Sequence, residues 1–356
     1  MKIGLVIYGS LDMLSGGYLY DRKLVEYLRE HGDTVEVISL PWRNYFAHLG
    51  DNFTFRLPPG LDLIIEDELN HPSLLRANQQ PHQYPIVSLV HHLRCSERHP
   101  AWQNSIYRAA ERRYLHTVDG FIFNSRTTAG VVRAVANIDK PGLVAYPPTD
   151  RFGSGLSGNA EQAIKFVNSR IAEIPPLRLL FIGNVIARKG LHILLQALGL
   201  LPAVKFHLDI VGSLTVEPAY TQEMQKLAGG LVSGTVHFHG ALNNDPLIQK
   251  LRTAHVLAVP SSYEGFGIVY LEGMAFGLPA IGTTSGAAPE IIADGETGFL
   301  IQPDDAQTLA SRLTALVTDR DLLARMSHNA LKRYQQQPRW EETAGQIRRF
   351  LQEQIE

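Results

Sequence analysis

The chain has 356 residues, enough for two α/β domains at the usual size of about 100 to 200 residues each. Hydrophobic residues make up 45% and charged residues 19%, and the formal net charge of -2 argues against a nucleic-acid partner, because binding to a phosphate backbone needs a basic face. The single cysteine, Cys95, excludes a disulfide framework and a thiolate metal site, and it favours a reducing compartment such as the cytoplasm.

The first 150 residues alternate apolar strand-like segments with helical stretches, which is typical of a doubly wound parallel sheet. The expected strands are residues 2–8, 35–40, 61–66, 84–90, 119–125 and 142–147. A glycine-bearing loop is predicted through Gly16 and Gly17, followed by a helix over about 20–30. Because residues 2–8 are shorter than a signal-peptide core and no apolar run approaches ~20 residues, we expect a cytoplasmic protein without a membrane span.

Residues 147–176 change in character, with prolines at both ends, several glycines and a helical piece near 161–170, and we interpret them as a linker. The strand pattern then resumes at residues 177–183, 206–212, 236–240, 255–260 and 278–283. The sequence therefore predicts an α/β protein of two Rossmann-like domains, over 1–150 and 177–338, with a ligand cleft between them. A last helix, within 339–356, is expected to cross back to the first domain.

The strongest functional pattern is EGFGIVYLE, residues 264–272, directly after the strand at 255–260. Ligands of doubly wound sheets gather at the carboxyl ends of strands, and a helix is expected to begin at about Phe266. The first N–H groups of a helix attract anions, and Gly265 and Gly267 allow a diphosphate to approach the backbone closely.

Two glutamates flank this predicted helix start. Glu264 lies just before the helix and Glu272 about six residues inside it, which separates them by roughly 9 Å along the axis. We interpret one carboxylate as holding the hydroxyls of a sugar and the other those of a ribose, with a pyrophosphate between them. The ordinary alternative is a solvated pair of surface glutamates beside a glycine turn.

At this point the sequence resembles the retaining glycosyltransferases of family 4, which have the two-domain fold called GT-B. Glu264 and Glu272 fit the Glu-x7-Glu motif of that family, between the family-like stretches PSSYEGFG and GMAFGLPAI, and residues 284–305 match the segment that follows. The resemblance implies a UDP- or GDP-hexose as co-substrate, with no other cofactor and no metal. It implies that Glu264 orients the sugar and Glu272 the ribose, and that the donor contacts Gly265, Phe266, Gly267 and Ile268.

A second pattern, FIGNVIARKG at residues 181–190, places two cations where a pyrophosphate would lie. Arg188 and Lys189 can neutralise a diphosphate leaving group without a metal ion. The resemblance assigns phosphate binding to Lys189 and an accompanying arginine. Many relatives have that arginine directly after the glycine, but here Asn184 follows Gly183, so Arg188 is expected to replace it. The alternative is a basic helix cap in solvent.

In the first domain, Gly16 and Gly17 resemble the glycine pair that approaches the donor and acceptor in the family, although adjacent glycines are also common in turns. His91, at the end of the strand at 84–90, aligns with the active-site histidine of the family. Its implied role is to contact the transferred sugar. A histidine at a strand end is equally an ordinary structural hydrogen-bonding residue.

Three further patterns are set aside. Residues 153–158 spell G-x-G-x-x-G but lack a preceding strand, and residues 319–321 spell Asp-x-Asp in a polar stretch between late helices. His237 and His239 alternate along one strand without an evident third ligand for a metal.

The catalytic prediction is a retaining transfer in which the diphosphate leaves while the acceptor attacks from the same face. A sugar-nucleotide epimerase, a phosphorylase and a non-catalytic nucleotide-sugar-binding subunit remain as alternatives. The last of these is favoured by Asn184 and by residues 147–150, where relatives often have a Gly-x-Asp turn. The acceptor is left open between a glycan, a lipid-linked molecule and a small molecule.

One segment of the first domain bears on the acceptor. Residues 91–116 hold more arginines than acids, and the aromatic residues Trp42, Tyr45 and Phe46 precede them. The plain interpretation is a solvated helix. The sharper one is a peripheral contact with an anionic acceptor or the inner face of the membrane. The arginines are Arg94, Arg98, Arg108, Arg112 and Arg113.

Overall fold

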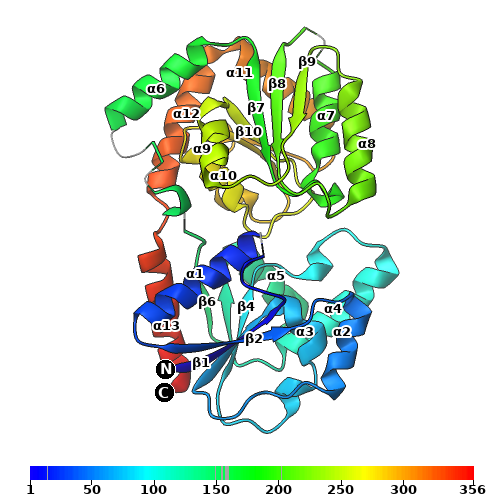
Figure 1. Ribbon diagram of the computed structural model, residues 1–356, viewed down its shortest axis with the longest axis vertical. Helices are drawn as coiled ribbons and strands as arrows, with labels where there is room; N and C mark the ends of the chain where they lie inside the picture. The colour runs from blue at the N-terminus through cyan, green and yellow to red at the C-terminus, as the bar shows by residue number, and fades with distance from the viewer. Residues whose placement is uncertain (14, 149, 154, 157–159, 202) are drawn as a thin grey trace. The chain divides into compact units, whose positions relative to one another are not determined.

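The computed structural model describes residues 1–13, 15–148, 150–153, 155–156, 160–201 and 203–356. Of the positions in the patterns above, five lie outside the described residues: Thr149, Ser154, Ser157, Gly158 and Asn159. The chain divides into two compact units, one formed by Met1–Pro148 and Pro338–Glu356 and the other by Thr149–Gln337. Both chain termini therefore belong to the first unit (Figure 1).

Each unit is built on a six-stranded sheet whose paired strands are all parallel. In the first the order is β2-β1-β3-β4-β5-β6, and in the second it is β12-β11-β10-β7-β8-β9. The strands of the first unit are β1 (Lys2–Tyr8), β2 (Thr34–Leu40), β3 (Leu63–Asp67), β4 (Ile86–Val90), β5 (Gly120–Phe123) and β6 (Gly142–Val144). Those of the second are β7 (Leu177–Ile182), β8 (Phe206–Val211), β9 (Gly234–Phe238), β10 (Val256–Ala258), β11 (Ala280–Thr283) and β12 (Gly298–Ile301).

The helices of the first unit are α1 (Gly16–Glu30), α2 (Tyr45–His48), α3 (His71–Leu74), α4 (Ala101–Leu115), α5 (Arg126–Ala136) and α13 (Trp340–Ile355). Those of the second are α6 (Ala160–Ala172), α7 (Leu191–Gly199), α8 (Pro218–Gly229), α9 (Asn244–Thr253), α10 (Ile268–Met274), α11 (Ala306–Thr318) and α12 (Arg320–Gln335). In the part of the chain that the structure describes, none of these helices has both the length and the apolarity that a bilayer span requires.

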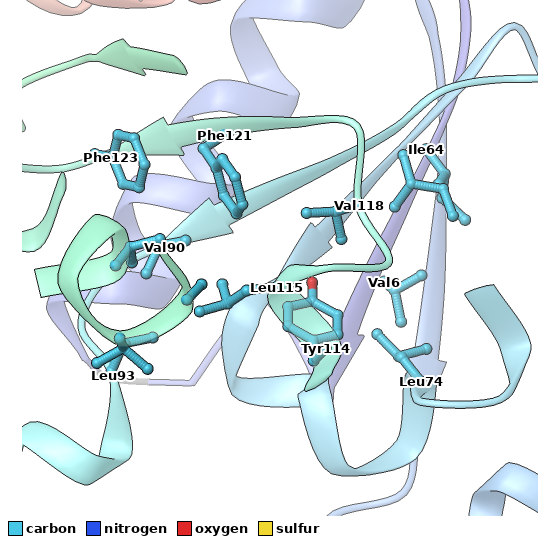
Figure 2. Packing of buried hydrophobic residues seen from close by; sticks show 14 of the residues in the cluster. Val6, Ile64, Leu74, Val90, Leu93, Tyr114, Leu115, Val118, Phe121 and Phe123 are labelled. Atoms are coloured by element: carbon cyan, nitrogen blue, oxygen red, sulfur yellow. The ribbon is translucent and has the colours of Figure 1, made fainter. Parts of the chain in front are cut away.

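Alternation along the strands produces a core on each face of the first sheet. Val6 and Tyr8 of β1 point to the face covered by α3, α4 and α5, where Figure 2 shows Tyr114 and Leu115 packed among strand residues. Ile3, Leu5 and Ile7 point to the other face, under α1 and α13. Full burial of such side chains contributes roughly 1.5–3 kcal/mol each, so both faces stabilise the unit.

Helix α13 is fixed in the first unit by polar as well as apolar contacts. It packs beside α1, as Figure 1 also shows. The Arg348 Nε atom donates to Asp33 Oδ2 at 2.7 Å, and the Thr343 hydroxyl donates to the Tyr146 carbonyl at 3.1 Å. Asp33 also accepts from the N-terminal ammonium at 2.8 Å. One buried carboxylate thus joins the first and last segments of the chain.

The predicted linker contains a structured helix. Residues 160–172 form α6, which packs on α12, and the buried Arg170 guanidinium donates to the carbonyls of Phe276 and Gly277 at 3.0 and 2.9 Å. Most of 147–176 is therefore part of the second unit as the contacts divide the chain.

Helix α1 and strand β12 differ from the sequence-based expectation. Helix α1 begins at Gly16, not near residue 20, because the Ser15 hydroxyl caps it by accepting from the Tyr18 N–H at 3.2 Å. Strand β12 was not predicted, since its four residues, GFLI, are too few to show a period, and its pairing with β11 completes the second sheet.

Candidate functional site

Two loops meet at the carboxyl edge of the second sheet. One follows β7 and the other follows β10, and these strands are neighbours in the sheet. The Ser262 N–H donates to the Arg188 carbonyl at 2.8 Å, and the Arg188 guanidinium donates to the Tyr263 carbonyl at 2.9 Å. Gly190 has a φ of +72°, and a Cβ there would lie 2.1 Å from the Pro260 carbonyl oxygen. This close backbone contact brings the cations of one loop to the glutamate of the other.

Lys189 and Glu264 form a buried ion pair in this place. The Lys189 Nζ lies 2.5 Å from Glu264 Oε1, and the side chains are only 15% and 7% exposed. The Ser261 hydroxyl donates to the same oxygen at 2.5 Å. Burial alone raises the pKa of Glu264, but Lys189 and then Arg188 outweigh it, so the pKa lies below its ordinary value. The carboxylate is therefore charged at neutral pH.

The segment between the glutamates is less helical than predicted. Helix α10 begins at Ile268, two residues later than expected, and it has seven residues. Gly267 is the residue before the helix, with a φ of +93° that a side chain would strain. Phe266 is buried, whereas Gly265 and Ile268 are partly exposed. The phosphate contact predicted for these residues is therefore with a glycine turn and the beginning of a short helix.

Glu272 lies inside α10 and is buried. Its Oε1 atom accepts from the Arg151 guanidinium at 2.7 Å, and its Oε2 atom has no hydrogen-bond partner among the described residues. Burial raises the pKa of Glu272, and Arg151 opposes the rise. An unpaired buried carboxylate oxygen is costly, and a ribose hydroxyl is the kind of donor that would satisfy it.

The two residues after β7 have different environments. Gly183 lies against the Lys189 stem, where a Cβ would be 3.4 Å from Lys189 Cδ. The Asn184 side-chain oxygen accepts from the Ser213 N–H at 3.2 Å, which joins this loop to the one after β8. Asn184 thus has a structural contact, and Arg188 and Lys189 are the cations that reach the glutamate loop.

The first unit holds the second group of predicted residues. His91 follows β4, and its Nε2 atom lies 2.9 Å from Oδ1 of Asp21, a fully buried residue of α1. Gly17 lies on the imidazole, since a Cβ there would be 3.2 Å from His91 Cδ2. Gly17 and Asp21 are four residues apart on α1, so one helix face holds the ring. Gly16 is the first residue of α1.

Charge reinforces this arrangement. Burial opposes the charged form of His91, but Asp21 and then Asp67 and Glu68 outweigh burial and raise the pKa of His91 to about 9. Burial, with the nearby charge of Asp21, raises the pKa of Asp67 to about 7. The ligand atoms of Asp21, Asp67 and His91 lie within 4.8 Å of one another, a spacing that a metal ion also permits. The Asp21–His91 ion pair accounts for two of these three groups.

Two of the three patterns that were set aside contain residues with structural roles. Asp319 caps α12 by accepting from the Leu322 N–H at 2.8 Å. His239 pairs with Asp209, its Nε2 lying 2.5 Å from Oδ1, and Lys250 reaches the same carboxylate at 2.9 Å.

Sequence reasoning missed three residues that hold the predicted ones: Asp21 beside His91, Ser261 beside Glu264, and Arg151 beside Glu272. Arg151 lies in the segment that the sequence analysis interprets as a linker. Asp21 lies on the same helix as Gly17, but nothing in the sequence indicated that it pairs with His91.

Comparisons with known proteins show what the chain is similar to. Residues 167–333 match the family described as "Glycosyl transferases group 1". A D-inositol 3-phosphate glycosyltransferase of Streptomyces avermitilis is 34% identical over 161 residues, which cover 43% of this chain and 35% of that protein. A GDP-mannose-dependent alpha-(1-6)-phosphatidylinositol monomannoside mannosyltransferase of Mycobacterium tuberculosis is 30% identical over 221 residues, covering 59% and 55%. The matches thus span about a third to a half of the lengths of these curated relatives.

Solved structures match over the whole chain. Sucrose-phosphate synthase from Thermosynechococcus elongatus has a TM-score of 0.78 at 20% identity, covering 99% of this chain and 98% of that one. HepE from Anabaena in complex with UDP-glucose has a TM-score of 0.72 at 20% identity, covering 99% and 100%. The predicted fold, two Rossmann-like parallel-sheet units of the GT-B type, is confirmed. Together with the family match, the findings support a glycosyltransferase.

Proposed function

We propose that the chain is a retaining glycosyltransferase of family 4 that transfers a hexose from a UDP- or GDP-hexose without a metal ion. The observation that carries this proposal is the buried Lys189–Glu264 ion pair, held beside Arg188 at the carboxyl edge of the second sheet. The names of the relatives support the donor class, since one is called GDP-mannose-dependent and HepE was solved with UDP-glucose.

The chemistry follows from the charges. Lys189 and Arg188 neutralise the diphosphate as the bond between sugar C1 and the phosphate oxygen breaks. The leaving phosphate oxygen accepts the proton of the acceptor hydroxyl, and the new bond from C1 to the acceptor oxygen forms on the same face of the sugar. Atoms and charge balance without a protein nucleophile or a metal.

Each remaining residue has a stated role in this proposal. Glu264 accepts hydrogen bonds from sugar hydroxyls, and the unsatisfied Oε2 of Glu272 accepts one from the ribose. The backbone at 265–268 contacts the diphosphate. His91, held by Asp21, contacts the transferred sugar, so its loss is expected to lower turnover and leave nucleotide binding intact. The acceptor is a glycan, a lipid-linked molecule or a small molecule, and the protein works in the cytoplasm.

Transfer can be tested with a panel of labelled UDP- and GDP-hexoses, a mixed acceptor extract, and EDTA in every sample. We expect release of one nucleoside diphosphate and a product whose anomeric configuration, read by NMR, equals that of the donor. A product of opposite configuration, or turnover only after a divalent metal is added, would contradict the proposal. Nucleotide-sugar binding without turnover for any donor would favour the binding-subunit alternative.

A further inference from the structure

The helix α4 of the first unit separates its charges by face. Its outer face carries Arg108, Arg112 and Arg113, all exposed, and His116 follows at the end of the helix. Its single acid, Glu111, is fully buried on the inner side, where it accepts from the backbone N–H groups of Arg94 and Cys95. The acid therefore contributes nothing to the outer face, and the arginines are not neutralised along their own helix.

The neighbouring helix extends the positive surface. Helix α5 packs against α4 and has two exposed arginines, Arg126 and Arg133, with no acidic residue anywhere along it. Between the two helices lies a groove of about 600 Å³. Its lining combines small side chains of both helices with the arginines of α4, so an anionic group suits it. The lining residues are Ser105, Arg108, Ala109, Arg112, Arg113, His116, Ala134 and Val135.

The same outer face of α4 continues into exposed apolar side chains. Trp102 is 63% exposed and Ile106 is 41% exposed. At 100° per residue, positions 102, 106, 109 and 113 lie along one strip of the helix, so the tryptophan and isoleucine adjoin the arginines. A large aromatic ring beside arginines is the side-chain combination found where proteins lie on a bilayer surface.

We propose that the outer face of α4 docks on an anionic phospholipid bilayer, with headgroup phosphates in the α4–α5 groove and Trp102 and Ile106 in the interfacial layer. Charge complementarity selects this partner over a neutral surface, and the exposed ring selects a bilayer over a soluble anion. The inference concerns a surface of the first unit and is independent of the donor chemistry proposed for the second.

The test is co-sedimentation of the full chain with vesicles of phosphatidylglycerol and phosphatidylcholine, compared with phosphatidylcholine alone. We expect binding only to the anionic vesicles, weakened by raising the salt from low concentration to about 0.15 M, where the Debye length falls to about 8 Å. Arg112→Gln with Arg113→Gln is expected to lower the partition coefficient about 30-fold, which corresponds to ~1 kcal/mol for each arginine.

A matched control changes the same charge elsewhere. Arg252→Gln with Arg325→Gln removes two exposed arginines of the second unit and is expected to leave vesicle binding unchanged. Trp102→Phe is expected to weaken binding and to remove the blue shift in tryptophan fluorescence that vesicles cause. Equal losses in both arginine pairs would overturn the proposal. So would binding of soluble polyphosphate to the groove without any binding to vesicles.

Discussion

Removing Lys189 tests the energetics of the candidate donor site. The Lys189→Met variant leaves the Glu264 carboxylate, 7% exposed, without its closest cation. Breaking a buried pair from one side costs about 3–5 kcal/mol of unfolding free energy. Glu264→Gln should cost less, because the flexible lysine stem lets its ammonium reach water. The double variant leaves no unpaired charge, so we expect it to recover at least about 2 kcal/mol relative to Lys189→Met.

The pH dependence of these variants has a definite sign. The pKa of Glu264 is lowered in the folded protein, so its stabilising contribution is present above its unfolded value near 4.5 and is lost as the pH falls through the folded value. In Lys189→Met, burial of Glu264 is opposed only by Arg188 and the Ser261 hydrogen bond, so the pKa of Glu264 rises relative to the wild type. The destabilisation of this variant should therefore shrink as the solution is acidified.

The assay must report on the second unit alone. All three tryptophans, Trp42, Trp102 and Trp340, belong to the first unit, so their fluorescence does not follow the second. Hydrogen exchange, measured by mass spectrometry on peptides from β7 and β10, reports on the unfolding of the second unit. The control is Lys226→Met, which changes an exposed lysine of α8. Strictly additive effects of the two single changes would refute the idea that the pair is energetically coupled.

Three further predictions concern the residues that hold the site. Asp21→Asn should lower the pKa of His91 from about 9, which an NMR titration of the imidazole would measure. The variant should also lack the stability that the wild type loses as the pH rises through that value. An unchanged titration midpoint would show that Asp21 does not hold the ring. Gly17→Ala should lower turnover, because its Cβ would lie 3.2 Å from His91 Cδ2, yet change stability by no more than about 1 kcal/mol, since alanine favours a helix. Arg151→Ala should raise the pKa of Glu272 further. As the solution is acidified, donor affinity, measured by titration at several pH values, should therefore begin to fall at a higher pH in this variant than in the wild type.

How far the sequence could predict the molecule depended on the length of each pattern. The strand at residues 2–8 agrees with β1 at both ends, because seven consecutive residues bury their side chains almost without interruption. Strand β12 could not be found, since its order comes from pairing with β11 and not from its own four residues. Local hydrogen bonding decided the start of α1, where the Ser15 cap outweighed the poor helix propensity of two glycines.

The candidate site also contains residues that the sequence could predict and residues that it could not. Lys189, Glu264 and Glu272 could be chosen from local motifs, and the first two indeed lie in contact. Ser261, which supports Glu264, is only three positions away from it, but the other two supporting residues could not be chosen, because their contacts join distant parts of the chain. Asp21 and His91 are 70 positions apart, and Arg151 and Glu272 are 121 apart. Such pairs have no signature in a single sequence, so the residues that tune charge and orientation emerge only from the fold.

The most direct test of the central claim is calorimetric titration of the purified chain with UDP, GDP, ADP and their hexose conjugates, in the presence of EDTA. Our account predicts tight binding of one nucleotide family, lost in the Lys189→Met, Glu264→Gln double variant and kept in Lys226→Met. Absence of binding across the whole panel, or equal binding by the double variant, would contradict a nucleotide-sugar site at Lys189 and Glu264.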